Sequence, residues 1–134
     1  MVRSPYSIRP YQHVLDALYA YLMIAALQYD EPDYAGAYNV GPDEQDCIST
    51  GELVEVFIKY WGDGLQWETC ACDRLKEANF LKLDCSKLKA TFGWNPRWRV
   101  EQAVEKVVEW SKCQLNNGDV RACMDKQIEE FLHE

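Results

Sequence analysis

The stretch from His13 to Tyr29 constrains the fold more than any other part of this chain. Its spacing predicts a helix that is apolar on almost every side. One side carries Val14, Leu15, Ala17, Leu18, Tyr21, Leu22, Ala25 and Ala26, and Tyr19, Met23, Ile24 and Leu27 lie elsewhere around it. Because so little polar surface is left for water, we expect other segments or a partner to cover this helix on most sides.

A short polar string, "IRPYQH", stands directly before this helix. Pro10 restricts the backbone of Arg9, so the planar guanidinium can be offered to an anion with little loss of freedom. The residues alone leave two interpretations of Arg9 open, an anion contact and a surface ion pair. For His13, at the helix start, we predict a capping or packing role rather than that of a catalytic base.

Composition indicates a single globular domain, with 134 residues, 48% hydrophobic and 27% charged. The formal net charge of −8 and the pI near 4.8 argue against a nucleic-acid partner, which requires a basic surface. Any anionic ligand must therefore be held by a few local cations. The longest apolar run, Leu18 to Leu27, is shorter than the roughly 20 residues of a membrane span, and no secretory leader is visible. We expect no membrane association and a cytoplasmic location.

The cysteines follow no metal-binding pattern, because they lack C-x2-C pairs and neighbouring histidines. They are Cys47, Cys70, Cys72, Cys85, Cys113 and Cys123. Cys70 and Cys72 are the only close pair, and on an extended segment both thiols would share one face. We therefore expect free thiols and no metal site.

The rest of the chain predicts further helices and short strands. "AYNVG" (37–41) is expected as a buried strand, and "LQWET" (65–69) and "NFLKLD" (79–84) as alternating strands. Helices are expected from Ser49 or Thr50 to Trp61, from Asp84 or Ser86 to Gly93, from about Val100, and from Asp119. Asp84, Ser86 and Lys87 are expected to cap and charge the first turn of their helix, and the tryptophans of "GWNPRW" to pack.

Motifs for catalysis are scarce. The chain has two histidines, and none of its eight tyrosines is followed four residues later by lysine. The sequence contains no G-x-G-x-x-G and no P-loop; Gly62-Asp63-Gly64 is followed by Trp67 where a third glycine would stand. The residues alone do not predict an enzyme.

Three segments, in order and in register, carry a family resemblance. "IRPYQHVLDALYAYL" (8–22), "AYNVGP" (37–42) and "EANFLKLDCSKLKATFGWNPRWRVEQAVEKVVEW" (77–110) resemble the C-terminal portion of nucleotide-sugar enzymes of the extended short-chain dehydrogenase/reductase superfamily. Within it, the chain is most similar to the CDP-glucose 4,6-dehydratases. Tyr11 stands where that family usually has tryptophan, and Lys76 where it usually has histidine.

The resemblance implies an α/β class, with residues 1–134 forming one mostly helical α+β lobe that binds a CDP-sugar and lacks the Rossmann domain. In the whole enzyme, NAD removes a hydride from C4 of the glucose, water is lost across C5 and C6, and the hydride returns to C6. The glycine-rich NAD turn and the Tyr-x-x-x-Lys pair of the family would lie upstream of this chain. We therefore expect no catalytic residue and no cofactor here, with the Rossmann lobe as partner.

Substrate contacts are expected from residues that match the family segments or neighbour them. These are Arg9, on the pyrophosphate, together with Gln12, Asn39, Lys76, Glu77 and Arg97. Asn39 can hydrogen-bond phosphate or ribose, and for Gln12 two interpretations are open, a structural role and a contact with sugar hydroxyls. Two alternatives stay open: the equivalent lobe of another nucleotide-sugar epimerase or dehydratase, and a free-standing helical module that uses its apolar helix to bind a partner protein. Apart from these alternatives, we expect the chain to self-associate through the same apolar helix or to expose its apolar surface.

Overall fold

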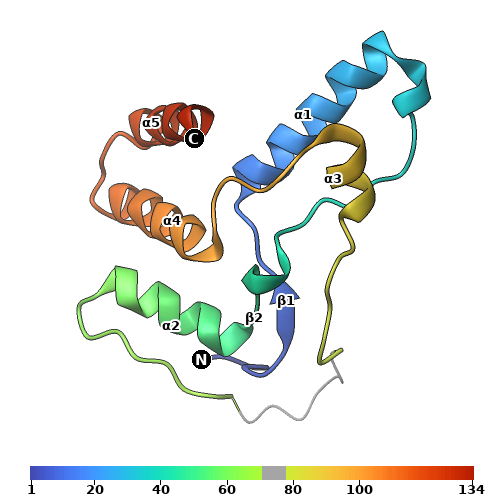
Figure 1. Cartoon of the computed structure of the whole chain (residues 1–134). Coiled ribbons are helices and arrows are strands. Elements are labelled where there is room, and N and C mark those ends of the chain that lie inside the picture. Colours follow the sequence, from blue (N-terminus) through green and yellow to red (C-terminus); the bar gives the residue numbers. More distant parts are fainter. Residues whose placement is uncertain (71–77) are drawn as a thin grey trace.

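Helices make up most of the structure (Figure 1). The computed structural model describes residues 1–70 and 78–134. Its helices are α1 (Val14–Asp30), α2 (Thr50–Trp61), α3 (Ser86–Phe92), α4 (Val100–Leu115) and α5 (Val120–His133). Strands β1 (Ile8–Pro10) and β2 (Cys47–Ser49) and the short 3₁₀ helices η1 (Pro32–Tyr34) and η2 (Glu44–Asp46) complete the described elements. The structure is thus a mostly helical α+β arrangement, as expected. No helix in the described ranges is long and apolar enough to span a membrane.

The helix ends follow local sequence rules. The Ser49 side chain accepts from the backbone N–H of Glu52 while the Glu52 carboxylate accepts from the Ser49 N–H, a capping box that starts α2. Asp119 caps α5 by accepting from Ala122 N–H at 2.9 Å. Gly62 and Gly93 follow α2 and α3 with φ of 73° and 64°, a region that side chains disfavour. These boundaries confirm the predicted helices.

The small sheet is centred on β1. It pairs antiparallel with β2, with Arg9 opposite Ile48. On its other side, Ile8 forms a parallel bridge with Phe80: Ile8 N–H donates to the Asn79 carbonyl at 3.0 Å, and Leu81 N–H donates to the Ile8 carbonyl at 3.1 Å. β1 is therefore held from both sides although it is only three residues long.

The predicted strands 37–41, 65–69 and 79–84 do not form. Thr69 and Phe80 make only isolated bridges, and side chains rather than a neighbouring strand hold 37–41. Lys87 Nζ donates to the Ala37 carbonyl at 3.1 Å, and Asn39 Nδ2 donates to the Asp84 carbonyl at 3.0 Å. The prediction was wrong because a strand needs a partner ladder, and no described segment provides one beside 37–41.

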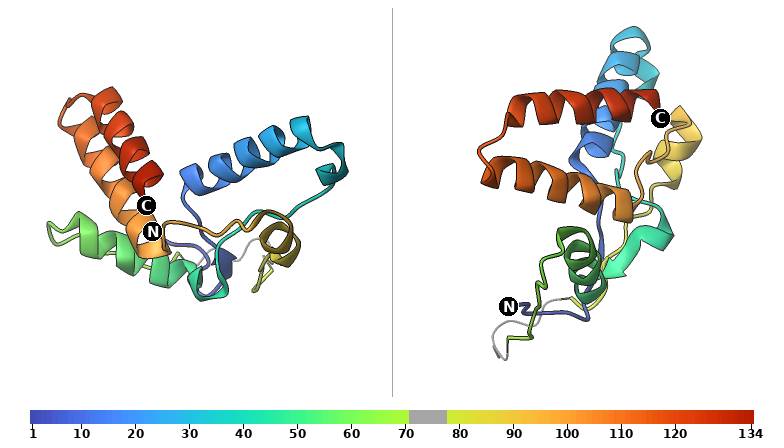
Figure 2. Two further views of the ribbon diagram at one scale, coloured as in Figure 1. Left: turned by 45° about the horizontal axis from the view of Figure 1, so that its top comes forward. Right: turned by 90° about the vertical axis from the view of Figure 1, so that its left-hand side faces the viewer.

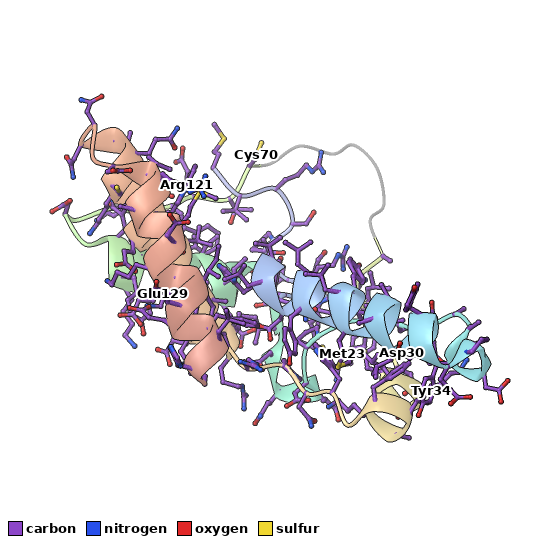
Figure 3. All side chains as sticks on the ribbon, turned by 90° about the horizontal axis from the view of Figure 1, so that it is seen from above. Met23, Asp30, Tyr34, Cys70, Arg121 and Glu129 are labelled. Atoms are coloured by element: carbon purple, nitrogen blue, oxygen red, sulfur yellow. The ribbon has the colours of Figure 1, made fainter. Side chains whose placement is uncertain are left out.

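The core lies on one side of α1. Ala20, Leu88 and Trp94 form its buried centre, with Tyr19, Met23, Ile24, Tyr38, Val40 and Phe92 packed around them. Figure 3 shows Met23 on the side of α1 that faces α3. Figure 2 shows α4 and α5 as an antiparallel pair, with α1 extending away from them. Other apolar side chains of α1 remain exposed, among them Val14, Leu18, Tyr21 and Leu22, so the described residues cover the helix on one side.

Candidate functional site

Arg9 is the central residue of β1, which pairs with β2 on one side and forms a bridge with Phe80 on the other. Its Nη1 donates to the carbonyl of Ile8 at 2.8 Å, and the side chain is half-buried. Pro10 follows it and restricts its backbone, as the sequence predicted. Strand and proline together place the guanidinium on a fixed support, which favours a directional contact with a ligand.

Hydrogen bonds of Tyr11 and Thr50 connect the segments on either side of β1 to the start of α2. The Tyr11 hydroxyl and the Thr50 hydroxyl are 2.9 Å apart, and Thr50 Oγ1 donates to the Ser7 carbonyl at 3.2 Å. Thr50 N–H donates to the same carbonyl at 3.0 Å. The phenol at position 11 therefore connects the start of α2 to the segment after β1, whereas the Thr50 contacts with Ser7 connect it to the segment before β1.

Gln12 contributes to the wall of an apolar cavity of about 490 Å³ between the start of α1, α2 and α4. Other lining residues include Phe57, Val104 and Val107. The Nε2 atom of Gln12 is shielded from solvent and has no hydrogen-bond partner among the described residues. A buried amide donor without an acceptor is destabilising by about 1–3 kcal/mol, so an acceptor that reaches this atom, water or ligand, would stabilise the region.

His13 caps α1 and packs, as predicted. Its Nδ1 accepts from Leu15 N–H at 3.2 Å, and its ring meets Trp98 edge to face, with centroids 4.7 Å apart. Burial, assisted by the nearby positive charge of Lys106, lowers the pKa of His13 to about 4. The imidazole is therefore neutral at physiological pH, which suits a structural acceptor.

Asn39 is exposed and holds the segment after η1 against the start of α3. Its amide donates to the Asp84 carbonyl at 3.0 Å, while the Asp84 carboxylate accepts from Ser86 N–H at 2.9 Å. The Ser86 hydrogen bonds lower the pKa of Asp84, consistent with its predicted capping role. The side-chain oxygen of Asn39 is not used in this hydrogen bond and is compatible with the predicted ligand contact, which stays a prediction.

Arg97 lies in a different environment from Arg9. Its guanidinium sits over the rings of Tyr19 and Phe131, at 4.5 and 5.1 Å from their centroids, and its Nη1 donates to the Phe131 carbonyl at 2.6 Å. It therefore joins α1 to the end of α5. The structure gives it this structural role, and the predicted substrate contact stays a prediction. Lys76 and Glu77 lie outside the described residues.

Two buried carboxylates anchor the same region, and the sequence reasoning had not singled them out. Asp16 is fully buried and its Oδ1 accepts from Arg97 N–H at 2.7 Å; Asp46 accepts from Arg99 Nε at 2.7 Å and from Val100 N–H at 3.1 Å. Burial raises the pKa of Asp16, although backbone hydrogen bonds oppose the shift. In the sequence, Asp16 could have been recognised as the single carboxylate on an otherwise apolar helix face.

Trp94 and Trp98 are both buried, which confirms that the "GWNPRW" turn packs rather than offering its rings to a base. Trp98 meets His13 and Phe131, whereas Trp94 belongs to the centre of the core. These rings fix the turn that carries Arg97.

The described part of the chain contains no helix start that is suited to bind the phosphates of NAD. β2 leads straight into α2, but Ser49 and Glu52 already occupy the first N–H groups of that helix, and a carboxylate there repels phosphate. Gly62 and Gly64 follow α2 rather than preceding a helix. The start of α2 and the Gly62–Gly64 turn therefore do not fit the phosphates of NAD.

Nothing in the described ranges groups three histidine, cysteine or acidic side chains in a geometry suited to a metal ion. Cys47, Cys70, Cys85, Cys113 and Cys123 form no disulfide, as expected, and Cys72 lies outside the described residues.

Comparison with known proteins confirms the resemblance to the CDP-glucose 4,6-dehydratases. The chain is 34% identical, over 133 residues, to the CDP-glucose 4,6-dehydratase of Salmonella typhimurium (strain LT2). The alignment covers 98% of this chain and 37% of that relative, so the chain spans little more than a third of the relative's length. No protein-family model matches the chain.

Proposed function

We propose that this chain is the nucleotide-sugar-binding lobe of a CDP-glucose 4,6-dehydratase of the extended short-chain dehydrogenase/reductase type. It holds a CDP-sugar, and catalysis takes place in a complete enzyme. The observation that carries the proposal is the similarity over 98% of the chain, which includes the Arg9 strand and the first turn of α1.

Arg9 is the proposed contact of the pyrophosphate. The chain has a net charge of −8, so an anionic ligand depends on individual cations rather than on a basic surface. A guanidinium matches two phosphate oxygens with parallel N–H donors, and β1 together with Pro10 limits the freedom that it loses on binding.

Gln12 and Asn39 are the proposed hydroxyl or phosphate contacts, joined by Lys76, Glu77 and Arg97. The unpartnered Gln12 Nε2 supports this role most directly, because a sugar hydroxyl or phosphate oxygen would supply its missing acceptor. In such an enzyme NAD supplies the redox chemistry when bound. The residues of this chain bind and orient the sugar nucleotide.

The exposed side of α1 is the proposed contact with a Rossmann-type lobe. Val14, Leu18, Tyr21 and Leu22 are exposed on this helix, and a soluble protein rarely leaves such a group uncovered. This chain spans 37% of the relative's length, so the remainder of such an enzyme is large enough to supply the cover. The same exposed residues favour the second candidate, a helical module that binds another protein.

Binding of CDP-glucose by wild type and Arg9→Ala tests the proposal. A bidentate, charge-assisted contact contributes roughly 1.5–3 kcal/mol, so Arg9→Ala is expected to weaken binding by one to two orders of magnitude. Arg9→Lys keeps the charge without the planar fork and is expected to recover only part of the affinity. Calorimetry or NMR titration measures this on the chain and on a complex with a co-expressed Rossmann lobe.

Arg121→Ala is the matched control, because Arg121 is an exposed arginine on α5 that pairs with Asp125. It is expected to bind CDP-glucose like wild type. UDP-glucose and dTDP-glucose serve as competitors: equal binding of all three favours another nucleotide-sugar enzyme over a CDP-glucose dehydratase. Wild-type affinity in a folded Arg9→Ala protein would contradict the Arg9 assignment. No binding of any sugar nucleotide by chain or complex would leave the interaction module as the better function.

A further inference from the structure

Helices α4 and α5 form an antiparallel hairpin whose register can be followed from one polar pair to the next (Figure 2). Lys106 pairs with Glu130. Three residues further along α4 and three residues back along α5, the Glu109 carboxylate accepts from Gln127 Nε2 at 3.2 Å. Another four residues on each helix lead to Cys113 and Cys123. The register therefore sets two thiols opposite each other near the turn.

The side-chain contacts agree with this register. Gln127 Nε2 reaches across to the Lys106 carbonyl at 2.9 Å and lies 3.9 Å from Cys123 Sγ, so Cys123 belongs to the side of α5 that faces α4. Cys113 Sγ lies over the turn, because a Cβ atom at Gly118 would approach it to 2.8 Å. The Gly118 N–H donates to the Cys113 carbonyl at 2.8 Å, which holds the turn closed there.

The Cys113 thiol contributes to the electrostatic environment of Cys123. Burial is the main cause that raises the pKa of Cys123, followed by the charge of Glu109 and by the neighbouring Cys113 thiol. Both cysteines are half-buried rather than fully buried, which leaves them open to a small reagent.

We propose that Cys113 and Cys123 are a redox modification site, at which a small-molecule disulfide such as glutathione disulfide reversibly converts the two thiols into an intrachain disulfide. One cysteine thiolate attacks the glutathione disulfide and releases one glutathione thiolate. The thiolate of the second cysteine then displaces the other glutathione from the mixed disulfide. Two protons and two electrons leave the protein, and one glutathione disulfide becomes two glutathione thiols.

Another neighbouring pair offers a comparison. Cys47 contributes to the electrostatic environment of Cys85, but Cys85 is only 6% exposed and its Sγ lies 3.8 Å from the carbonyls of both Gly41 and Leu83. A reagent cannot reach that sulfur without opening the protein. Of these two pairs in the described part of the chain, Cys113 and Cys123 are the one in which the thiols face each other and a small reagent can reach them. This inference does not depend on the proposed function.

Peptide mapping tests the proposal directly, since trypsin cleaves after Lys112, Arg121 and Lys126 and so separates the two cysteines into peptides 113–121 and 122–126. The folded full chain is treated with glutathione disulfide, alkylated, digested without reductant and examined by mass spectrometry. The expected result is a single cross-linked species joining the two peptides. It disappears after treatment with dithiothreitol.

Variants separate this result from random oxidation. Cys123→Ser is expected to abolish the cross-link and leave Cys113 as a glutathione adduct, whereas Cys47→Ser is expected to form the cross-link like wild type. Oxidised wild type is expected to melt about 5 °C higher than the reduced protein, because the disulfide reduces the conformational freedom of the unfolded chain. Cys123→Ser should lose this increase. Separate glutathione adducts on both cysteines, unmodified thiols, or cross-links to other cysteines would each overturn the proposal.

Discussion

At the scale of single residues, Asp16 shows how burial and hydrogen bonding compete. Its side chain is fully enclosed, Oδ1 accepts from Arg97 N–H at 2.7 Å, and Oδ2 has no hydrogen-bond partner among the described residues. Desolvation of the charge outweighs the hydrogen bonds and raises the carboxyl pKa. Asp16 therefore stabilises the fold through the hydrogen bond that Oδ1 accepts rather than through its negative charge.

Asp16→Asn and Asp16→Ala are expected to separate these contributions. The amide keeps an oxygen for Arg97 N–H and removes the buried charge, so its free energy of unfolding at pH 7 should stay within about 1 kcal/mol of wild type. Alanine leaves Arg97 N–H without an acceptor and should lose about 1–3 kcal/mol or more. Urea unfolding measures both. Equal destabilisation by the two variants would mean that the negative charge, through its attraction to Arg97, is required.

His13 makes stability depend on pH in the opposite sense to Asp16. The folded state lowers the pKa of His13 from 6.5 to about 4, so its contribution is complete above pH 6.5 and is lost as the pH falls toward 4. Asp16, with its raised pKa, favours the folded state at low pH instead. Lys106 is the cation that faces His13 and adds to its shift.

His13→Asn is expected to make stability less sensitive to acid, since asparagine can still cap α1 but does not titrate. Between pH 7 and pH 5 the wild type should lose about 2 kcal/mol more than the variant. Unfolding curves at both pH values give this difference, in which the other titrating groups cancel. An identical pH dependence in both proteins would show that His13 is not protonated on unfolding.

At the scale of elements, α1 has two unlike sides. One side packs on α3 and Trp94 to form the core, and the other exposes apolar residues that include Leu22, with 71% of its surface open to solvent. The sequence predicted a helix that is covered on nearly every side, and the described residues cover it on one side. An apolar helix side without cover drives association.

The chain is therefore expected to self-associate, or to bind a dye for apolar surfaces, through α1. Leu22→Glu should reduce both effects because a charge on that face opposes burial. Leu115→Glu, at an apolar residue of α4 that is 67% exposed, is the matched control and should behave like wild type. Sedimentation across a concentration series measures association. A strictly monomeric wild type that binds no dye would contradict this prediction.

At the scale of the whole molecule, the described elements form a lobe that can carry a ligand-binding arginine but show no seat for a dinucleotide. The N-terminus of α2 is closed by its own capping box, and the paired strands β1 and β2 run antiparallel. Parallel strands with a glycine-rich turn before a helix are what such a seat requires.

The purified chain is accordingly expected to bind no NAD and to convert no CDP-glucose. Fluorescence titration with NAD and chromatography for a 4-keto-6-deoxy product provide the measurements. Co-expression with a Rossmann lobe of the relative's type is the positive control and should restore conversion under the proposed function. Turnover by the chain alone would contradict the assignment of a binding lobe.

The sequence by itself determined the helices, because their signals are local. Ser49 and Glu52, Asp119 and the glycines at 62 and 93 lie within a few residues of the ends that they define. The family resemblance was equally readable from the sequence, and the comparison confirmed it. The capping role of His13 followed from its position before an apolar run.

Only the tertiary structure decided which residues meet across long distances in the chain. Residues 37–41 have strand composition but form no strand, since pairing depends on a neighbour that composition cannot specify. Arg97 became a bridge between Tyr19 and Phe131, and Asp16 an acceptor for the Arg97 backbone, through contacts that follow from packing. Local propensities set an element's type and ends, whereas burial, pKa and partners arise when distant segments exclude water together.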